Sequence, residues 1–166
     1  MDATTPVLRT ATVADAERWS RFAADAFRVT FAADNDPADM AAYLASAFSP
    51  DLQRAELADP ATTVILAENA GAIAGYVQFV RHAGAVHLKR LYVDPAEKGR
   101  GLARLLTGRV LESARAGGAT RVWLGVWERN PRAIAFYRKV GFVVVGSEVF
   151  QLGSDPQTDL VMELRF

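Results

Sequence analysis

Residues 91–103 read LYVDPAEKGRGLA and predict a strand, a turn, a glycine loop and the start of a helix. The apolar run from Leu91 stops at Asp94, because the Pro that follows cannot donate to a sheet ladder. Gly99 and Gly101 stand one residue apart, directly before an apolar helical pattern. The first turn of that helix would present bare backbone N–H groups. Such a loop either binds an anion with main-chain atoms or is an ordinary strand-to-helix turn, and both readings stay open at this point.

The composition is that of one globular domain spanning residues 1–166. Hydrophobic residues make up 51% of the chain, which is enough for a sizeable core. Acidic and basic residues balance at 19 each, so the formal net charge is zero. Long basic runs are also missing from the sequence. The charge pattern therefore argues against a nucleic-acid partner.

The sequence contains no cysteine, which excludes disulfides, zinc-thiolate sites and a thiol nucleophile. No reaction of this chain can pass through a cysteine-bound intermediate. We expect no metal site. No stretch approaches the length of an apolar membrane span, and the N-terminus lacks a basic segment followed by an apolar run. We expect a cytoplasmic protein that does not act at a membrane.

Before the glycine loop, the pattern changes from helical to extended. Residues 7–10 predict a short strand, and Thr12 is positioned to cap a helix whose apolar face includes Phe27. The segments beginning at Asn35 and Ser49 each place Pro at a helix start. Alternating β-branched and aromatic residues then predict three antiparallel strands at 63–68, 73–80 and 86–93.

After the loop, a helical face begins at Leu102 and ends before Gly117. Residues 122–126 predict a buried strand, in which Gly125 indicates either a bulge or a close backbone approach. A helix follows Asn130, and residues 142–150 and 159–166 predict the last two strands. The order of elements predicts an α+β domain built on a mostly antiparallel sheet.

In this order, the motifs resemble the GNAT superfamily of N-acetyltransferases. The loop KGRGLA at 98–103 is similar to the pyrophosphate loop of that family, with Lys98 where Gln or Arg is usual. The block NPRAIAFYRKVGF at 130–142 is similar to a second family motif. Segments 43–48, 73–77, 123–128 and 157–160 further resemble bacterial Pai-type N-acetyltransferases, which act on spermidine and spermine.

The resemblance implies a twisted, mixed sheet of about seven strands with helices on both faces and a splayed central strand pair. It implies acetyl-CoA as the acyl donor, an acyl-CoA-binding core at residues 86–142 and a helical acceptor-side region at residues 12–59. The donor pyrophosphate would lie against N–H groups of Gly99, Arg100, Gly101, Leu102 and Ala103. Side chains of Lys98, Arg100 and Arg104 would add positive charge, although an exposed Arg on such a turn can also simply be solvated.

The same resemblance implies roles at the end of the preceding strand and on the later helix. The pantetheine arm would lie along Leu91 and Val93, and the N–H of Leu91 would stabilise the oxyanion. Asn130 would bond to that arm, or cap its helix, or do both. Tyr137 would be the acid that protonates the leaving thiolate, against the alternative of a core tyrosine.

The base and the acceptor amine are less defined by the sequence. Many family members carry a Glu on the strand before the loop, and this chain has His87 and Lys89 there. His87 is a candidate proton carrier or an ordinary surface histidine, with Glu68 and Glu128 as alternative carboxylates. The exchange of acidic for basic residues disfavours a strongly cationic acceptor.

The predicted reaction is direct acetyl transfer to a primary amine of a small molecule, with a polyamine as the leading candidate. The alternatives are a peptide or protein α-amine as acceptor, and a non-catalytic acyl-CoA-binding module. The aromatic side chains of Phe27, Phe31 and Tyr43 are expected to form the acceptor wall or part of the core. A homodimer is one expected assembly, through pairing of the terminal strand between two copies.

Overall fold

The structure is a computed structural model that describes residues 4–166 of the chain. It contains one sheet with the strand order β1-β2-β3-β4-β5-β7-β6. The strands are β1 Val7–Thr10, β2 Thr62–Asn69, β3 Ala72–His82, β4 Ala85–Val93, β5 Arg121–Trp127, β6 Val143–Leu152 and β7 Asp155–Arg165. The α-helices are α1 Ala16–Phe31, α2 Pro37–Ala47, α3 Pro50–Ala58, α4 Leu102–Ala116 and α5 Pro131–Val140. The prediction of a single α+β domain with a mixed sheet is confirmed.

The helix starts follow from side chains that satisfy free backbone N–H groups. The carboxylate of Asp36 accepts from the N–H groups of Ala38 and Asp39 at the start of α2. The hydroxyl of Ser49 accepts from the N–H of Leu52 at the start of α3. Both helices carry Pro in their first turn, where its missing N–H costs no hydrogen bond. These caps confirm the starts predicted from the sequence.

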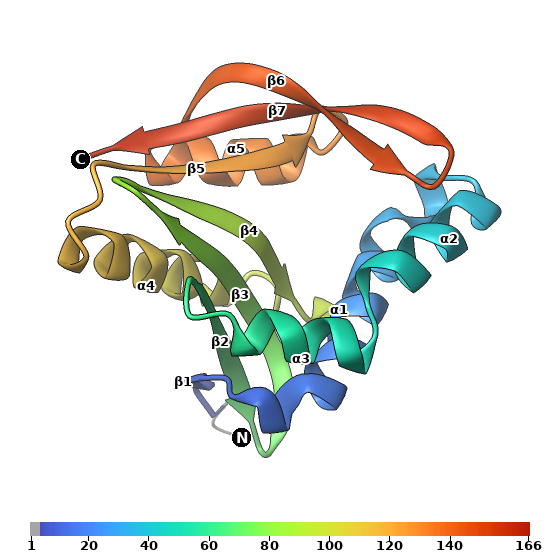
Figure 1. The fold of residues 1–166 in the computed structure, drawn as a ribbon, viewed down its shortest axis with the longest axis horizontal. Coiled ribbons are helices and arrows are strands. Elements are labelled where there is room, and N and C mark those ends of the chain that lie inside the picture. Colours follow the sequence, from blue (N-terminus) through green and yellow to red (C-terminus); the bar gives the residue numbers. More distant parts are fainter. Residues whose placement is uncertain (1–3) are drawn as a thin grey trace.

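The sheet is antiparallel except where β4 meets β5. Those strands pair only over residues 85–87 and 121–123, so that His87 opposite Trp123 is the last pair. Beyond this point the strands diverge toward α1 and α2 (Figure 1). The splayed central pair expected from the resemblance is therefore present.

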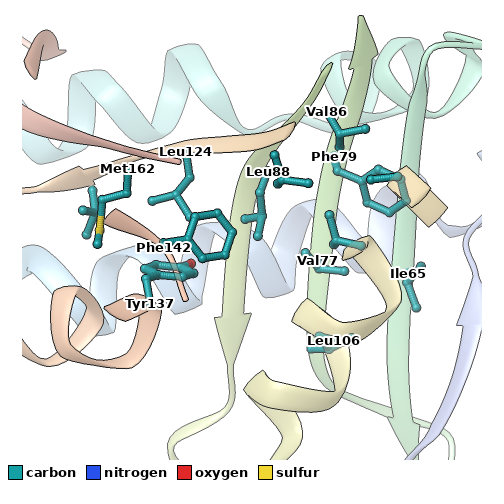
Figure 2. Close-up of a cluster of buried hydrophobic side chains, with 14 of the residues drawn as sticks. Ile65, Val77, Phe79, Val86, Leu88, Leu106, Leu124, Tyr137, Phe142 and Met162 are labelled. Atoms are coloured by element: carbon teal, nitrogen blue, oxygen red, sulfur yellow. The ribbon is translucent and has the colours of Figure 1, made fainter. Parts of the chain in front are cut away.

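Two apolar cores lie on opposite faces of the sheet. On one face, α4 and α5 cover a core that includes Ile65, Val77, Phe79, Leu88, Leu106, Val110, Leu124, Phe142 and Met162 (Figure 2). On the other face, α1 and α2 cover a core that includes Trp19, Phe27, Met40, Phe48, Leu66 and Tyr76. Burial of such side chains contributes about 1.5–3 kcal/mol each before the loss of chain entropy. The cores hold the two faces of the splayed region in place.

The last strand differs from the prediction in length and position. It begins at Asp155, and β6 extends to Leu152, so the two strands form one long hairpin turned at Gly153. The hairpin end is held by Asp39 of α2, whose carboxylate accepts from the N–H of Ser154 at 2.8 Å and from its hydroxyl at 2.6 Å.

Strand β7 lies between β5 and β6 and pairs with both of them. The expectation that the terminal strand pairs across a homodimer is therefore wrong, because its backbone is already hydrogen-bonded on both sides. Strands β1 and β6 form the sheet edges. Among residues 4–166, no helix has the length and apolar character needed to cross a membrane.

Candidate active site

A cavity of about 680 Å³ occupies the region where β4 and β5 diverge. Its walls come from β4, the glycine loop, the start of α4, β5 and α5, together with side chains from α1, α2, β6 and β7. Nearly all the residues singled out from the sequence line it: Phe27, Phe31, Tyr43, His87, Leu91, Val93, Lys98, Gly99, Gly101, Leu102, Ala103, Arg104, Asn130 and Tyr137. Arg100 and the alternative carboxylates Glu68 and Glu128 do not line it. The topology thus brings distant segments of the chain to one site.

The glycine loop leaves a row of backbone N–H groups without acceptors. Gly99 and Gly101 have φ values of 80° and 83°, a conformation that side chains with a Cβ strongly disfavour. Backbone hydrogen bonds of this segment end with the N–H of Lys98 and resume with the N–H of Leu105, which donates to Gly101. Within the described chain, no acceptor meets the N–H groups from residue 99 to residue 104. Together with the positive end of the α4 dipole, they form an anion site.

The basic side chains around this loop fall into two groups. Lys98 and Arg104 line the cavity, where either can approach an anion. Arg100 instead lies 3.1 Å from the carboxylate of Glu97 in a partly exposed ion pair. The solvated alternative for Arg100 matches its position outside the cavity.

Strand β4 turns unpaired main-chain groups into the cavity. The N–H of Asp94 donates to the carbonyl of Ala74 on β3 at 2.8 Å. Hydrogen-bonded and non-hydrogen-bonded pairs alternate along an antiparallel ladder, so the main-chain polar groups of Leu91 and Val93 point away from β3. They face the region that β5 has left. An extended chain bearing amides can satisfy them there.

Asn130 has one occupied and one available polar group. Its side-chain oxygen accepts from the N–H of Ala133 at 3.2 Å and so caps α5. Among the described residues, its amide NH₂ donates to no acceptor, and the residue lines the cavity. Capping of the helix and binding of a ligand are therefore compatible.

Tyr137 lies on α5 with only 8% of its surface exposed. Its ring meets Phe142 edge to face at 5.6 Å between centroids, and Figure 2 shows it grouped with Phe142, Leu124 and Met162. Burial raises the pKa of the Tyr137 phenol well above its ordinary value. The hydroxyl is therefore protonated at neutral pH and can act only as a proton donor there. Tyr137 belongs both to the core and to the cavity wall.

His87 lies at the vertex of the splay and stacks on Trp123. Their ring centroids are 3.8 Å apart and the planes differ by 3°. Burial, and then the nearby His82 and Lys89, lower the pKa of His87 to about 4. The imidazole is therefore neutral at pH 7 and holds a proton weakly. The alternative carboxylate Glu68 pairs with Arg9 and Arg18, and it does not line the cavity.

The basic residues of β4 have their own counter-charge. The ammonium of Lys89 lies 3.4 Å from Glu56, and the guanidinium of Arg90 lies 3.3 Å from it. Burial opposes ionisation of Glu56, but these cations and a hydrogen bond from Gln78 keep its pKa below the ordinary value. Glu56 of α3 thus offsets one of these two positive charges. The basic residues of β4 therefore give a weaker argument against a cationic acceptor than the sequence indicated.

Aromatic side chains from α1, α2, β5 and β6 form a connected part of the cavity wall. Phe27 and Tyr43 have ring centroids 4.6 Å apart. Phe31 meets Trp127 of β5 at 5.8 Å, and Tyr43 meets Phe150 of β6 at 5.2 Å. Phe27 is also buried in the core, so both sequence-based readings of these aromatic residues hold for it.

Two acidic cavity residues were missed from the sequence. Glu148 on β6 and Asp159 on β7 are cross-strand partners, and both line the cavity. A Cβ added at Gly125 would overlap the Glu148 carboxylate and lie 3.3 Å from Asp159 Oδ2. The glycine inside β5 thus marks a close approach rather than a bulge, since β5 and β7 keep regular register there. The signals in the sequence were that glycine and the Pai-type resemblance of residues 157–160, which include Asp159.

Comparisons with known proteins point to one family. A model described as Acetyltransferase (GNAT) family matches residues 17–142. An uncharacterized N-acetyltransferase of Mycobacterium tuberculosis (strain H37Rv) is 38% identical over 138 residues, which cover 80% of this chain and 88% of the relative.

Two solved structures share the fold. The PaiA N-acetyltransferase from Thermoplasma acidophilum, in complex with coenzyme A, matches with a TM-score of 0.86 and 19% identity over 98% of this chain and 100% of that one. A chimera of the spermidine N-acetyltransferase SpeG from Vibrio cholerae matches with a TM-score of 0.72 and 21% identity, over 98% and 96% of the chains.

Proposed function

This chain belongs to the acetyltransferase (GNAT) family, and from that premise we propose that it transfers acetyl from acetyl-CoA directly to a primary amine of a small molecule. The leading acceptor is a polyamine such as spermidine. One observation carries the proposal: a single cavity combines a loop of unbonded N–H groups, an unpaired strand edge and the buried hydroxyl of Tyr137. These are the parts needed to hold a nucleotide thioester, polarise its carbonyl and protonate the leaving sulfur.

The donor side is assigned to residues 86–142. The N–H groups of residues 99–104 fit a pyrophosphate, because several backbone donors converge on an anion without fixed side-chain charge. Lys98 and Arg104 line the same part of the cavity and add cationic contacts. When bound, acetyl-CoA supplies an activated acyl group as a thioester.

Main-chain groups of β4 would hold the arm of the donor and its carbonyl. The outward groups of Leu91 and Val93 are placed to bond amides of an extended arm, and the NH₂ of Asn130 offers one more donor. The N–H of Leu91 is our candidate for the oxyanion contact. A fixed donor aimed at developing negative charge lowers the barrier, since it needs no reorganisation during the reaction.

Proton transfer is assigned to Tyr137 and His87. The protonated phenol of Tyr137 donates to the leaving thiolate. His87 is neutral, and its low pKa means that a proton taken from the amine passes readily to water. We therefore assign His87 the role of passing a proton from the amine to solvent, not that of a strong base.

The acceptor side is assigned to residues 12–59, completed by aromatic residues of β5 and β6. Methylene chains of an aliphatic amine can pack on the rings of Phe27, Phe31, Tyr43 and Trp127. Aromatic faces also attract ammonium groups. Both properties suit a polyamine.

An acceptor panel tests this function. Purified protein is incubated with acetyl-CoA, and free thiol is followed with spermidine, spermine, butylamine and a peptide with a free α-amine. We expect spermidine or spermine to give the highest kcat/KM. Preference for the peptide would favour an α-amine acceptor. Binding of acetyl-CoA without thiol release above the no-acceptor rate, across the whole panel, would contradict catalysis and support a binding module.

A further inference from the structure

Asp159 is a buried carboxylate without a partner, placed on the wall of the cavity. It exposes 9% of its surface. Among residues 4–166, no N–H or O–H group donates to its side chain and no cation pairs with it. Other buried acids of the chain are paired: Asp15 with Arg9, and Glu163 with Arg121 and Arg165. The side-chain oxygens of Asp159 are not fully buried and open onto the cavity, so a cation bound there can pair with the carboxylate.

A second carboxylate lies beside it. Glu148 occupies the cross-strand position opposite Asp159 on the same face of the hairpin. Burial, and then the charge of Glu148, raise the pKa of Asp159 to about 6. Like charges opposite each other on a sheet destabilise it. The pair therefore adds no stability to the folded chain by itself.

Gly125 makes room for both carboxylates over strand β5. The Glu148 carboxylate occupies the space that a Cβ at Gly125 would take, and Asp159 Oδ2 lies at its edge. Gly125 is beyond the last β4–β5 pair, so this space adjoins the open part of the splay. The carboxylates thus lie next to the region assigned to the thioester.

The surroundings suit an organic cation. Trp127 follows Gly125 by two positions on the same face of β5 and is the cross-strand partner of Asp159. Phe150 follows Glu148 by two positions and therefore shares its face of β6. A pair of carboxylates flanked by aromatic rings binds an ammonium group by charge and its carbon chain by apolar contact.

We infer that Glu148 and Asp159 form the cation subsite of the acceptor pocket, which binds an ammonium group of the amine to be acetylated. This inference rests on the proposed acetyl transfer and specifies its acceptor as a cationic aliphatic amine. The carboxylates come from the β6–β7 hairpin.

The test uses conservative variants that keep side-chain shape. Glu148→Gln and Asp159→Asn each remove one charge. The control, Glu163→Gln, removes a charge from β7, the strand that carries Asp159, at a position outside the cavity. With spermidine as the varied substrate, we expect the first two to raise KM about tenfold or more, as for loss of a charge-assisted contact. The KM for acetyl-CoA stays within about twofold, and Glu163→Gln leaves both values near wild type.

Equilibrium binding separates this inference from the proposed function. Titration of spermidine into the protein with coenzyme A present should show about tenfold weaker binding to Asp159→Asn, whatever the turnover. Butan-1-ol, which lacks the charge, should not compete. The inference is overturned if Asp159→Asn and Glu148→Gln change spermidine KM and affinity no more than Glu163→Gln, or if they lower kcat alone. If no amine is turned over but spermidine binding still depends on the pair, the transfer reaction fails and the cation subsite stands.

Discussion

The part of the cavity proposed to bind the donor and the part proposed to bind the acceptor differ in the groups that line them. The donor end consists mainly of main-chain groups from one continuous segment, β4 through the start of α4. The acceptor end consists of side chains from α1, α2, β5, β6 and β7, which are far apart in the sequence. A site formed by backbone N–H groups depends on a local loop conformation, which glycines in the sequence indicate. A site formed by side chains from distant segments depends on the complete fold, because only the fold brings those side chains together.

The largest expected effect comes from Tyr137, which serves both ends. Tyr137→Phe removes the proton donor and keeps the ring in its core contacts. We expect kcat with the best amine to fall about a hundredfold or more, the usual range for general acid catalysis. The matched control is Tyr76→Phe, since Tyr76 is a buried tyrosine outside the cavity. Equal kcat for the two variants in the thiol-release assay would remove Tyr137 from the mechanism.

At the donor end, Gly101→Val should act almost entirely on acetyl-CoA. Gly101 has a φ of 83°, and a β-branched residue there costs roughly 1–3 kcal/mol or forces the loop to move. The N–H groups would lose their common direction. We expect KM for acetyl-CoA to rise about ten- to hundredfold, with spermidine KM little changed. Gly84→Val, in another turn with positive φ and outside the cavity, controls for backbone strain. A similar rise in that control would assign the effect to folding.

At the acceptor end, Asp159→Asn should stabilise the protein in a pH-dependent way. The pKa of Asp159 is raised from 3.8 to about 6 in the folded state, so ionisation favours the unfolded chain. Stability contributed by this group is highest below pH 4 and is lost as pH rises to about 6. This shift in the pKa of Asp159 corresponds to a loss of roughly 3 kcal/mol in the free energy of unfolding. Screening by solvent in the cavity reduces that loss to about 1–2 kcal/mol.

Urea unfolding at pH 4 and at pH 7 measures this effect. The variant should match wild type at pH 4 and exceed it in free energy of unfolding at pH 7. Glu163→Gln should behave in the opposite way, because Arg165 and Arg121 outweigh burial and lower the pKa of Glu163. Loss of the Glu163 charge should therefore lower the free energy of unfolding at pH 7. Equal pH profiles for wild type and Asp159→Asn would show that Asp159 ionises normally.

The smallest effect is expected at Arg100. Arg100 does not line the cavity, and it forms a partly exposed ion pair with Glu97. Arg100→Ala should change KM for acetyl-CoA by less than about threefold, since exposed pairs contribute up to about 1 kcal/mol. Arg104→Ala, which removes a cavity cation, should have the larger effect. The reverse order would mean that Arg100 leaves Glu97 to bind the donor.

The sequence predicted the helix starts and the glycine loop well because their signals are local. Pro37 and Pro50 with their caps set helix starts, and Gly99 and Gly101 set the loop. The acceptor end could not be predicted in this way. Glu148 and Asp159 meet only because β6 and β7 pair in one register, and nothing near either residue specifies that pairing.

The position of the last strand in the sheet could also not be predicted from local sequence patterns. The last strand inserts between β5 and β6, so its edges are occupied even though it ends the chain. The environment of His87 was hidden in the same way: the ring stacks on Trp123 through the parallel β4–β5 pair, and burial lowers its pKa to about 4. Each of these differences depends on a long-range strand pairing.

Gly125→Ala tests most directly the claim that donor and acceptor bind to separate parts of the cavity. The new Cβ displaces the flexible end of Glu148 and presses on Asp159, while the donor loop is untouched. Isothermal titration should be carried out with acetyl-CoA alone and then with spermidine in the presence of coenzyme A. We predict about tenfold weaker binding of spermidine and acetyl-CoA affinity within about twofold of wild type. Equal loss of both ligands, or unchanged affinity for spermidine, would contradict the account.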